Sequence, residues 1–210
     1  MHWKSWADIS NVKGKGGLGF RDVQCFNNAL LAKQVWRMLT NPNLLVSKVV
    51  KRRYFPKSSI LDARVKNGAL WIWQSLHSSI EMLKSGLRKQ VGDGTTIAIW
   101  KDGWLKTSSG KISTPKPHNC PVDKVSDLIH DHKWNSGIIN SLFSPEETKL
   151  ITAIPLSLFG GKDRYTWCSS ANGEYTTKTG YVKAKERMER NNKRLLLQES
   201  TSKNKQNSRI

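Results

Sequence analysis

Apolar residues recur at helical spacing in several separate stretches, and this pattern constrains the fold more than any other feature of the chain. The first stretch carries apolar residues at intervals of four and three: Cys25, Ala29, Ala32, Trp36 and Leu39. Such spacing places the side chains on one face of a helix. Val23, Phe26 and Leu30 form a second apolar side. We therefore expect this helix to be buried between two neighbours, with Asp22 as its N-cap.

Three further helices are predicted from capping and spacing signals. Asn41 and Pro42 predict the start of the second helix, because asparagine is a good N-cap and proline is favoured at the first helical position. Its apolar side is expected from Leu45, Val46, Val49 and Val50, and its charged surface from Lys48, Lys51, Arg52 and Arg53. Spacing of three and four predicts an amphipathic helix with Trp73, Leu76, Ile80, Leu83 and Leu87 on one face. Ser144-Pro145-Glu146-Glu147 is a capping box, which predicts another helix.

Two segments change from helical to strand periodicity around glycine turns. Residues 90–100, with a Gly-Asp-Gly turn, predict one β-hairpin. Residues 165–177 predict a second, because Asn172-Gly173 favours the type I′ turn. Short helices are expected between the hairpins, around Val125 and around Ile138.

The fold class predicted from these elements is α-rich α+β, with a helical N-terminal half, two β-hairpins and a disordered basic C-terminal tail. Disorder is expected from Glu199 onward, where the chain is polar and almost without apolar residues. The predicted segments are 1–57, basic and helical; 58–105, a helix plus a β-hairpin; 106–121, a linker rich in Ser, Thr, Lys and Pro; 122–184, helices plus a β-hairpin; and 185–210, a charged, partly disordered tail.

Positive charge is concentrated at the two ends of the chain. The 210 residues include 35 basic and 16 acidic side chains, a net charge of +19. Residues 1–57 carry 11 basic and 2 acidic residues, and residues 185–210 carry 8 and 3. Such a surplus predicts a polyanionic partner, most simply RNA or DNA bound without sequence specificity. Charge that only keeps the chain soluble would give the same composition.

The candidate phosphate-binding residues are the basic side chains that gather in and after the second helix: Lys48, Lys51, Arg52, Arg53 and Lys57. They combine density with expected exposure, as contacts to a phosphate backbone require. A solvated helix face would look the same in the sequence. The nine tryptophans could stack on bases, but most fall on apolar helix faces or in strands, which favours core packing.

Three other motifs invite sharper assignments that the sequence does not favour. Gly14-x-Gly16-x-x-Gly19 fits the dinucleotide fingerprint, but it lacks the preceding strand and the later acidic residue. His130-Asp131-His132 lacks further ligands at metal-binding spacing, so a solvated turn is expected. Cys168 is expected to be a buried structural thiol. No cofactor or metal site is predicted.

The sequence also indicates the compartment. No stretch approaches the roughly 20 apolar residues that a membrane span needs, and the N-terminus has no apolar signal-peptide core. Three widely spaced cysteines, Cys25, Cys120 and Cys168, form no disulfide framework. We expect an intracellular protein of the nucleus or cytoplasm, neither secreted nor membrane-bound.

Ordered motifs over residues 2–184 resemble one known family. In chain order they are His2-Trp3-Lys4-Ser5-Trp6, Gly16-Gly17-Leu18-Gly19-Phe20-Arg21-Asp22, Phe26-Asn27-Asn28-Ala29-Leu30-Leu31-Ala32-Lys33-Gln34, Tyr54-Phe55-Pro56, Val91-Gly92-Asp93-Gly94, Trp100-Lys101-Asp102-Gly103-Trp104-Leu105, Val125-Ser126-Asp127-Leu128-Ile129, and Asn172-Gly173-Glu174-Tyr175. The set resembles plant LINE-type (non-LTR) retrotransposon reverse transcriptases. It matches the region after the polymerase core and before the zinc-binding and ribonuclease H segments.

The resemblance implies an RNA-directed DNA polymerase as the parent, but the chain lacks the paired aspartates that hold its catalytic metal ions. Glu146-Glu147 is the only adjacent acidic pair, and capping explains it. We therefore expect a non-catalytic fragment that contacts nucleic-acid phosphates, with the polymerase core, supplied in trans, as a further partner. Two alternatives stay open: a stand-alone nucleic-acid-binding or assembly protein co-opted from the element, and a pseudogene product without function.

Overall fold

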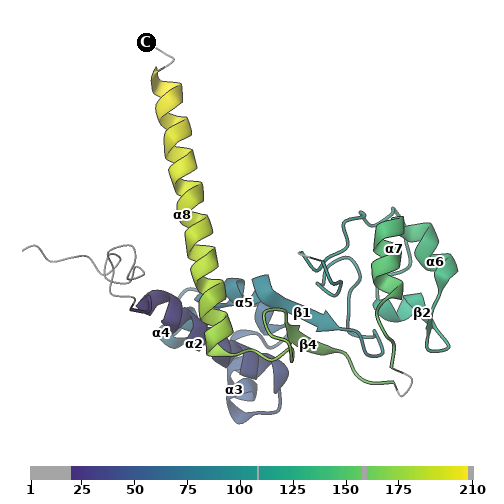
Figure 1. Cartoon of the computed structure of the whole chain (residues 1–210). Coiled ribbons are helices and arrows are strands. Elements are labelled where there is room, and N and C mark those ends of the chain that lie inside the picture. The colour runs from purple at the N-terminus through teal and green to yellow at the C-terminus, as the bar shows by residue number, and fades with distance from the viewer. Residues whose placement is uncertain (1–19, 108, 158–159, 208–210) are drawn as a thin grey trace, which may run out of the picture. The chain divides into compact units, whose positions relative to one another are not determined.

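A computed structural model describes residues 20–107, 109–157 and 160–207, and the chain divides into two compact units. Unit 1 comprises the chain up to Ser85 and from Tyr175 onward, and unit 2 comprises Gly86–Glu174. Figure 1 shows the elements of both. The boundaries of the units differ from those of the predicted segments. The chain passes from unit 1 to unit 2 after Ser85, inside the segment 58–105, and back to unit 1 after Glu174, inside the segment 122–184.

Unit 1 is helical. Its elements are α2 (Val23–Thr40), α3 (Leu45–Tyr54), the 3-10 helix η2 (Ile60–Asp62), α4 (Trp71–Ser78), α5 (Ile80–Gly86) and the long α8 (Thr177–Asn207). In α2 the predicted face is confirmed, because Cys25, Ala29, Ala32 and Trp36 are all buried. The predicted cap is also confirmed, since the Asp22 carboxylate accepts a hydrogen bond from the Cys25 amide at 2.7 Å.

The second apolar side of α2 is not buried between neighbours, contrary to the expectation. Val23 is 57% exposed and Leu30 is 41% exposed. In the described part of the chain, α2 packs one side against α8, α4 and α3. The buried side of α2 is wider than predicted, because it also includes Val35 and Met38. Val23 and Leu30 lie outside it and are exposed to solvent.

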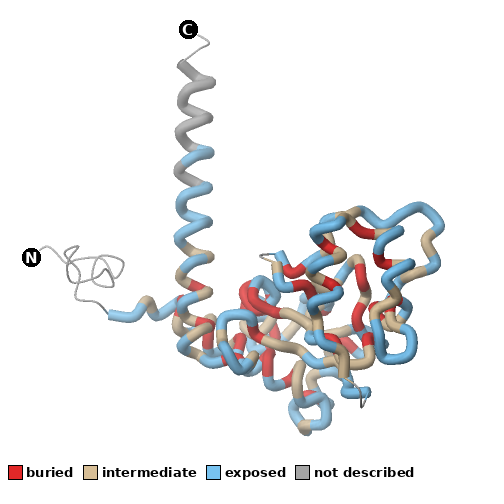
Figure 2. The backbone as a smooth tube through the Cα atoms, turned by 45° about the vertical axis from the view of Figure 1, so that its right-hand side comes forward, coloured by how far each residue is buried: buried red, intermediate tan, exposed pale blue. Residues whose placement is uncertain are grey.

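Tyr175 anchors the start of α8 on α2. Its hydroxyl donates to the buried Ala29 carbonyl at 3.0 Å, and its ring stacks on Trp36 with 6.2 Å between centroids. Gly180 is required here, because a Cβ at that position would meet the Tyr175 hydroxyl. Along this first part of α8, Ala184 is buried as well. Figure 2 shows the change along α8 from partly buried turns to exposed ones.

The disorder expected from Glu199 differs from the structure, in which α8 continues as a helix to Asn207. Residues 208–210 lie outside the described residues. The prediction rested on missing apolar surface, which governs tertiary packing. A helix also gains from its own backbone hydrogen bonds. Four of the nine residues 199–207 are Glu, Lys or Gln, which have good helix propensity, and the other five are Ser, Thr or Asn, which have less.

The predicted amphipathic helix from Trp73 forms as two helices, α4 and α5, with Ser79 between them. The predicted face survives the break, because Trp73, Ile80, Leu83 and Leu87 are buried. Ser79 is itself fully buried, and its hydroxyl donates to the Leu76 carbonyl at 2.7 Å. This local bond competes with the helix ladder and accounts for the break.

Unit 2 holds two small antiparallel sheets. Strand β1 (Leu87–Gln90) pairs with β4 (Arg164–Trp167), with Leu87 opposite Trp167, and β2 (Ile129–His130) pairs with β3 (Lys133–Trp134). The 3-10 helix η3 (Val125–Leu128) and the helices α6 (Ser136–Leu142) and α7 (Pro145–Thr152) complete the unit. The core of unit 2 consists of Val91, Ile97, Ile99, Trp104, Leu105, Val125, Leu128, Ile139, Phe143 and Ile151.

Neither predicted hairpin forms, although the fold class, α-rich with two small antiparallel sheets, is confirmed. β1 lies just before the first predicted hairpin and shares only Gln90 with it, β4 lies at the start of the second, and the two strands pair with each other. After β1, the Asp163 carboxylate binds the amides of Gly92, Gly94 and Thr96 at 2.8–2.9 Å, and the loop wraps around it. After β4, Thr176 accepts from the Thr179 amide at 3.2 Å and caps α8, so no return strand follows.

The local hairpin β2–β3 replaces part of the short helices expected around Val125 and Ile138. Its turn residues Asp131 and His132 both have positive φ, 48° and 58°, as the type I′ turn requires. The capping box at Ser144 is confirmed, and Glu147 also binds the Ser113 amide at 2.6 Å. The segment predicted as a linker, 106–121, is thus a loop fixed within unit 2. No helix in the described part of the chain is both long and apolar enough to cross a bilayer.

Candidate nucleic-acid interface

Helix α3 begins three residues later than the sequence predicted. Asn41 is the C-cap of α2 and not the N-cap of α3, since its amide donates to the Arg37 carbonyl at 2.9 Å. Leu44 occupies the N-cap of α3 without a side-chain hydrogen bond. The Ser47 hydroxyl donates to the Asn41 carbonyl at 2.9 Å and ties the first turn of α3 to the end of α2.

An aromatic stack fixes the other end of α3. The Tyr54 ring lies parallel to Trp73, with 4.7 Å between centroids and 5° between planes, and Phe55 stacks on the same indole at 5.6 Å. Trp73 is 1% exposed and Phe55 is 7% exposed. Offset aromatic pairs contribute about 0.5–1.5 kcal/mol beyond their buried area. The stack holds α3 on the surface of unit 1 through its last turn.

The expected apolar side of α3 faces solvent, which corrects the prediction. Leu45 is 78% exposed, Val46 53% and Val49 57%. The packed side is formed instead by Ser47 and the aromatic residues after it. The outward face therefore mixes aliphatic side chains with the cations, because Lys48 and Val49 lie four and three residues before Arg52.

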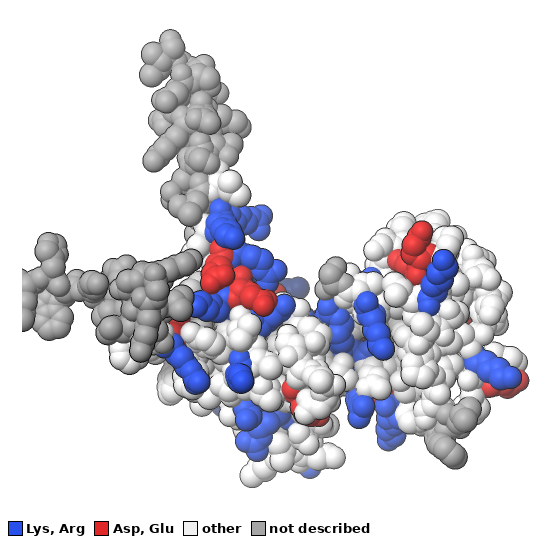
Figure 3. Space-filling view, viewed as in Figure 1, with Lys and Arg blue, Asp and Glu red and all other residues white. Residues whose placement is uncertain are grey.

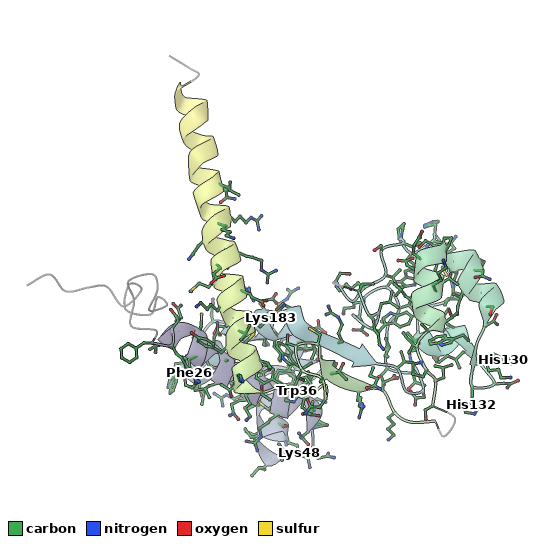
Figure 4. The ribbon with its side chains drawn as sticks, viewed as in Figure 1. Phe26, Trp36, Lys48, His130, His132 and Lys183 are labelled. Atoms are coloured by element: carbon green, nitrogen blue, oxygen red, sulfur yellow. The ribbon has the colours of Figure 1, made fainter. Side chains whose placement is uncertain are left out.

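All five predicted phosphate contacts, Lys48, Lys51, Arg52, Arg53 and Lys57, are exposed, and we call them the α3 basic cluster. Among the described residues none of them forms an ion pair with a carboxylate. The Arg53 guanidinium lies over the Tyr54 ring, 5.7 Å from its centroid. Figure 4 shows Lys48 at the outer edge of α3, and Figure 3 shows Lys and Arg side chains on this part of the surface.

The sequence stretch that contains most of the cluster's neighbours along the chain, from Val23 to Leu61, is without acidic residues. The same stretch holds seven lysines and arginines. Unit 2 carries 11 basic and 9 acidic residues, so the remaining 24 and 7 belong to unit 1, a net charge of +17 against +2. The charge surplus of the chain is thus a property of unit 1.

A small recess lies beside the cluster. It has a volume of about 120 Å³ and is lined by the polar residues Lys51, Ser58, Ser59 and Ser47 and by the apolar residues Met38, Leu39, Pro42, Phe55 and Ile60. A lysine and serine hydroxyls are groups that bind phosphate oxygens in proteins. The recess brings part of the α3 basic cluster together with hydroxyl groups that the sequence analysis did not select, because no local pattern marks them.

The structure describes one of the two remaining sequence motifs. Gly14, Gly16 and Gly19 lie outside the described residues. The expected solvated turn at His130-Asp131-His132 is confirmed, since all three residues are exposed. Figure 4 shows His130 and His132 at the tip of the β2–β3 hairpin. No group of three or more metal-ligating side chains occurs in the described segments.

The cysteines divide into one buried and two accessible thiols. Cys25 is 4% exposed, and burial raises the pKa of its thiol to about 11, with the Asp22 carboxylate adding to the shift. Such a thiol stays protonated and unreactive near neutral pH. Cys168 is exposed, which corrects the expectation of a buried thiol. It directly follows Trp167, the end of β4, whose indole takes the inward position and is fully buried.

The tryptophans mainly pack in the core, as predicted. Trp36, Trp73, Trp104 and Trp167 are at most 4% exposed. Trp71 is the exception, at 76% exposed. Trp3 and Trp6 lie outside the described residues.

The acidic residues of unit 2 serve its loops. Burial would raise the pKa of Glu147, but hydrogen bonds from Thr114, from the Ser113 amide and from the Ser144 amide outweigh burial and lower it. The backbone amides of Lys124 and Asp123 lower the pKa of Asp127 in the same way. These carboxylates are occupied by amide donors, as loop-fixing groups are.

Comparison with known proteins gives two relatives, both from Arabidopsis thaliana. One is an "Uncharacterized mitochondrial protein", 39% identical over 106 residues, which are 50% of this chain and 69% of the relative. The other is a "Putative ribonuclease H protein", 29% identical over 194 residues, which are 86% of this chain and 30% of the relative. The chain thus spans less than a third of the length of the second. No family model and no solved structure matches this chain.

The first relative is similar over most of its own length at an identity that establishes common descent. The chain therefore belongs to the same family as this mitochondrial protein of Arabidopsis.

Proposed function

We propose that the chain is a non-catalytic segment of retrotransposon origin that binds RNA or DNA through phosphate contacts made by the α3 basic cluster. The observation that carries the proposal is the cluster itself: exposed cations without ion-pair partners among the described residues, on a unit with net charge +17. Contacts of lysine and arginine with phosphates supply most of the sequence-independent affinity for nucleic acids.

The retrotransposon origin rests on the ordered motifs of residues 2–184, which resemble plant LINE-type reverse transcriptases beyond the polymerase core. The similarity to a relative named as a ribonuclease H protein agrees with that position, because ribonuclease H segments follow the same region in such elements. In this role the segment would seat template or primer for a polymerase core, and would itself add no nucleotides.

A stand-alone binding protein is a second candidate, favoured by one observation. The 106 residues matched in the mitochondrial relative make up 69% of it, which gives a length of about 150 residues. A separately encoded protein of that size, similar to this chain, indicates that the region can exist apart from a full-length element.

The salt dependence of binding tests the proposal. Each phosphate contact contributes about −0.7 to the slope of log K against log salt for single strands, and about −0.9 for duplex DNA. The double variant Arg52→Gln/Arg53→Gln should therefore flatten the slope by about one to two units. Glutamine keeps part of the arginine stem and stays polar, while it removes the guanidinium that lies over the Tyr54 ring.

The matched control removes the same charge from another exposed helix of unit 1. Lys33 and Arg37 lie on α2, are exposed, and form no ion pair among the described residues. Lys33→Gln/Arg37→Gln should leave the slope unchanged. Equal slopes for the wild type and the Arg52/Arg53 variant would refute the assignment to α3.

The C-terminal helix offers a competing source of charge. It should be shortened only beyond Arg194, because Cys25 lies within 3.9 Å of the Met188 sulfur and Ala184 is buried. A chain ending at Arg194 should keep most of its affinity. If that truncation abolishes binding, the end of α8 carries the contact and the α3 basic cluster is only a solvated face.

Primer extension tests the non-catalytic part of the proposal. With primer, template, nucleotides and magnesium or manganese, the purified chain should incorporate nothing above a blank. Incorporation that survives stringent purification would show a polymerase activity and overturn this part.

A further inference from the structure

A groove in unit 2 gathers four cations from three separate parts of the sequence. It has a volume of about 700 Å³, and its lining includes Arg88, Lys89, Lys106 and Arg164. Among the described residues, no aspartate or glutamate lines it. The pairing of β1 with β4 creates this arrangement, because Arg88 and Lys89 lie on β1 and Arg164 lies on β4.

The cations differ in how they are held. Lys89 is occupied, since its ammonium binds the Asp102 carboxylate and the Thr96 carbonyl, each at 2.7 Å. The Arg164 Nε donates to the Gln90 side chain at 2.9 Å. Neither Lys106 nor Arg164 forms an ion pair with a carboxylate in the described segments, and both are exposed.

One wall of the groove is shaped around an arginine. A Cβ at Gly110 would overlap the Arg88 guanidinium, and Gly110 has φ of +74°. The Gly110 carbonyl accepts from the Trp104 and Leu105 amides at 2.7 and 2.9 Å, which fixes the turn against the core. Glycine therefore allows the turn to close directly over Arg88, and the position of the cation is set by the fold.

Charge accumulation here is selective within unit 2. The unit as a whole is nearly balanced, with a net charge of +2. Its carboxylates Asp127, Glu147 and Asp163 accept hydrogen bonds from loop amides and do not line the groove. Figure 3 shows Lys and Arg side chains in the region that β1 and β4 occupy in Figure 1.

We propose that this groove binds the phosphate backbone of single-stranded nucleic acid, as a second contact separate from the α3 basic cluster. The inference rests on the proposed function and extends it to unit 2. A single strand fits a recess because its backbone bends freely, whereas duplex DNA stays straight over about 150 base pairs. Ser170 and Asn172 also line the groove and offer hydrogen bonds to phosphate or base edges.

Cys168 provides a reporter at the groove, because it is exposed and belongs to the lining. Its alkylation rate, followed by peptide mass, should fall several-fold when the full chain is saturated with oligo(dT). Cys120 serves as the internal reference, since it is partly exposed and does not line the groove. The same measurement on Arg52→Gln/Arg53→Gln at saturating oligo(dT) should still show protection of Cys168.

The double variant Lys106→Ala/Arg164→Ala should lose that protection and flatten the salt slope by about one unit, as expected for up to two lost single-strand contacts. Lys133→Ala/Lys149→Ala is the matched control, because both lysines are exposed in unit 2 outside the groove. Their removal should change neither the protection of Cys168 nor the salt slope. The urea midpoints of all variants establish that they are folded.

Three results would overturn the inference. If the chain binds oligo(dT) while Cys168 reacts at its free rate, the groove is empty and only the α3 proposal stands. If polyglutamate protects Cys168 as well as oligo(dT) does, the groove takes acidic peptides. If the chain binds no oligo(dT) at all, the proposed function fails together with this extension of it.

Discussion

Replacing Asp163 by alanine should destabilise unit 2 selectively, because this one carboxylate organises the loop before Ile97. Its Oδ1 accepts from the amides of Gly92 and Gly94 at 2.8 and 2.9 Å. Its Oδ2 accepts from the amide and the hydroxyl of Thr96, both at 2.8 Å. The loop leads directly into the buried Ile97 and so sets the position of this core segment.

The magnitude follows from which donors water can reach after the substitution. Thr96 is exposed, so water replaces the carboxylate there, whereas Gly94 is buried. A hydrogen bond to a charged group contributes about 1.5–3 kcal/mol, and a buried amide left without a partner costs about 1–3 kcal/mol. With the bond to Gly94 lost and the bond to Gly92 partly replaced, we expect a loss of about 3 kcal/mol.

Hydrogen exchange resolves this loss by unit. The amides of Ile99 and Val125, which bind the Asp123 and Ile97 carbonyls at 2.9 and 3.0 Å, should exchange about 100-fold faster in Asp163→Ala. Amides of α2 should keep their rates. Asp93→Ala is the control, because Asp93 is in the same loop but binds only Thr95. A change below about fivefold in unit 2, or an equal effect of Asp93→Ala, would refute the reasoning.

Three further substitutions test individual contacts. Glu147→Gln should lower the free energy of unfolding by about 1.5–3 kcal/mol. Because the pKa of Glu147 is lowered in the folded state, its contribution is complete above about pH 4.5 and is lost as the pH falls through the folded pKa. The urea midpoints of wild type and variant should therefore converge in acid, and pH curves that stay parallel would contradict this. Tyr175→Phe should cost about 1 kcal/mol by urea titration, since it removes the hydrogen bond to the buried Ala29 carbonyl, and an unchanged midpoint would speak against that bond. Gly86→Ala should destabilise unit 2 by about 1–3 kcal/mol, because the new Cβ would lie 2.5 Å from the Trp167 ring; a neutral result in thermal unfolding would show that the ring moves freely.

Local signals in the sequence predicted local structure well. The face of α2, the Asp22 cap and the Ser144 capping box all depend on residues within four positions of one another, and all three are present. The strand pairing could not be predicted in this way, because β1 and β4 are more than 70 residues apart. What selects this pairing over two local hairpins is the Asp163 carboxylate on one side and the Thr176 cap on the other.

The candidate site shows the same division. Charge density predicted the α3 basic cluster, and the exposure of its members follows from their chemistry. The exposure of Leu45 and Val49 could not be predicted, because periodicity alone does not tell which side of a short helix finds a partner. Here the aromatic stack on Trp73 decides, and it packs the side of α3 that carries Ser47 and Tyr54. The unit 2 groove escaped prediction for a related reason: Arg88, Lys106 and Arg164 meet only after the sheet has formed.

Lysine footprinting tests most directly whether nucleic acid lies on the α3 basic cluster. Acetylation rates of Lys48, Lys51 and Lys57 should be measured with and without saturating single-stranded RNA or DNA, with Lys133 and Lys149 of unit 2 as references, since all five are exposed. Phosphates bound at α3 should slow the acetylation of Lys48, Lys51 and Lys57 several-fold and leave the two references unchanged. Unchanged rates at Lys48, Lys51 and Lys57 under conditions where the nucleic acid is bound would contradict the proposed interface.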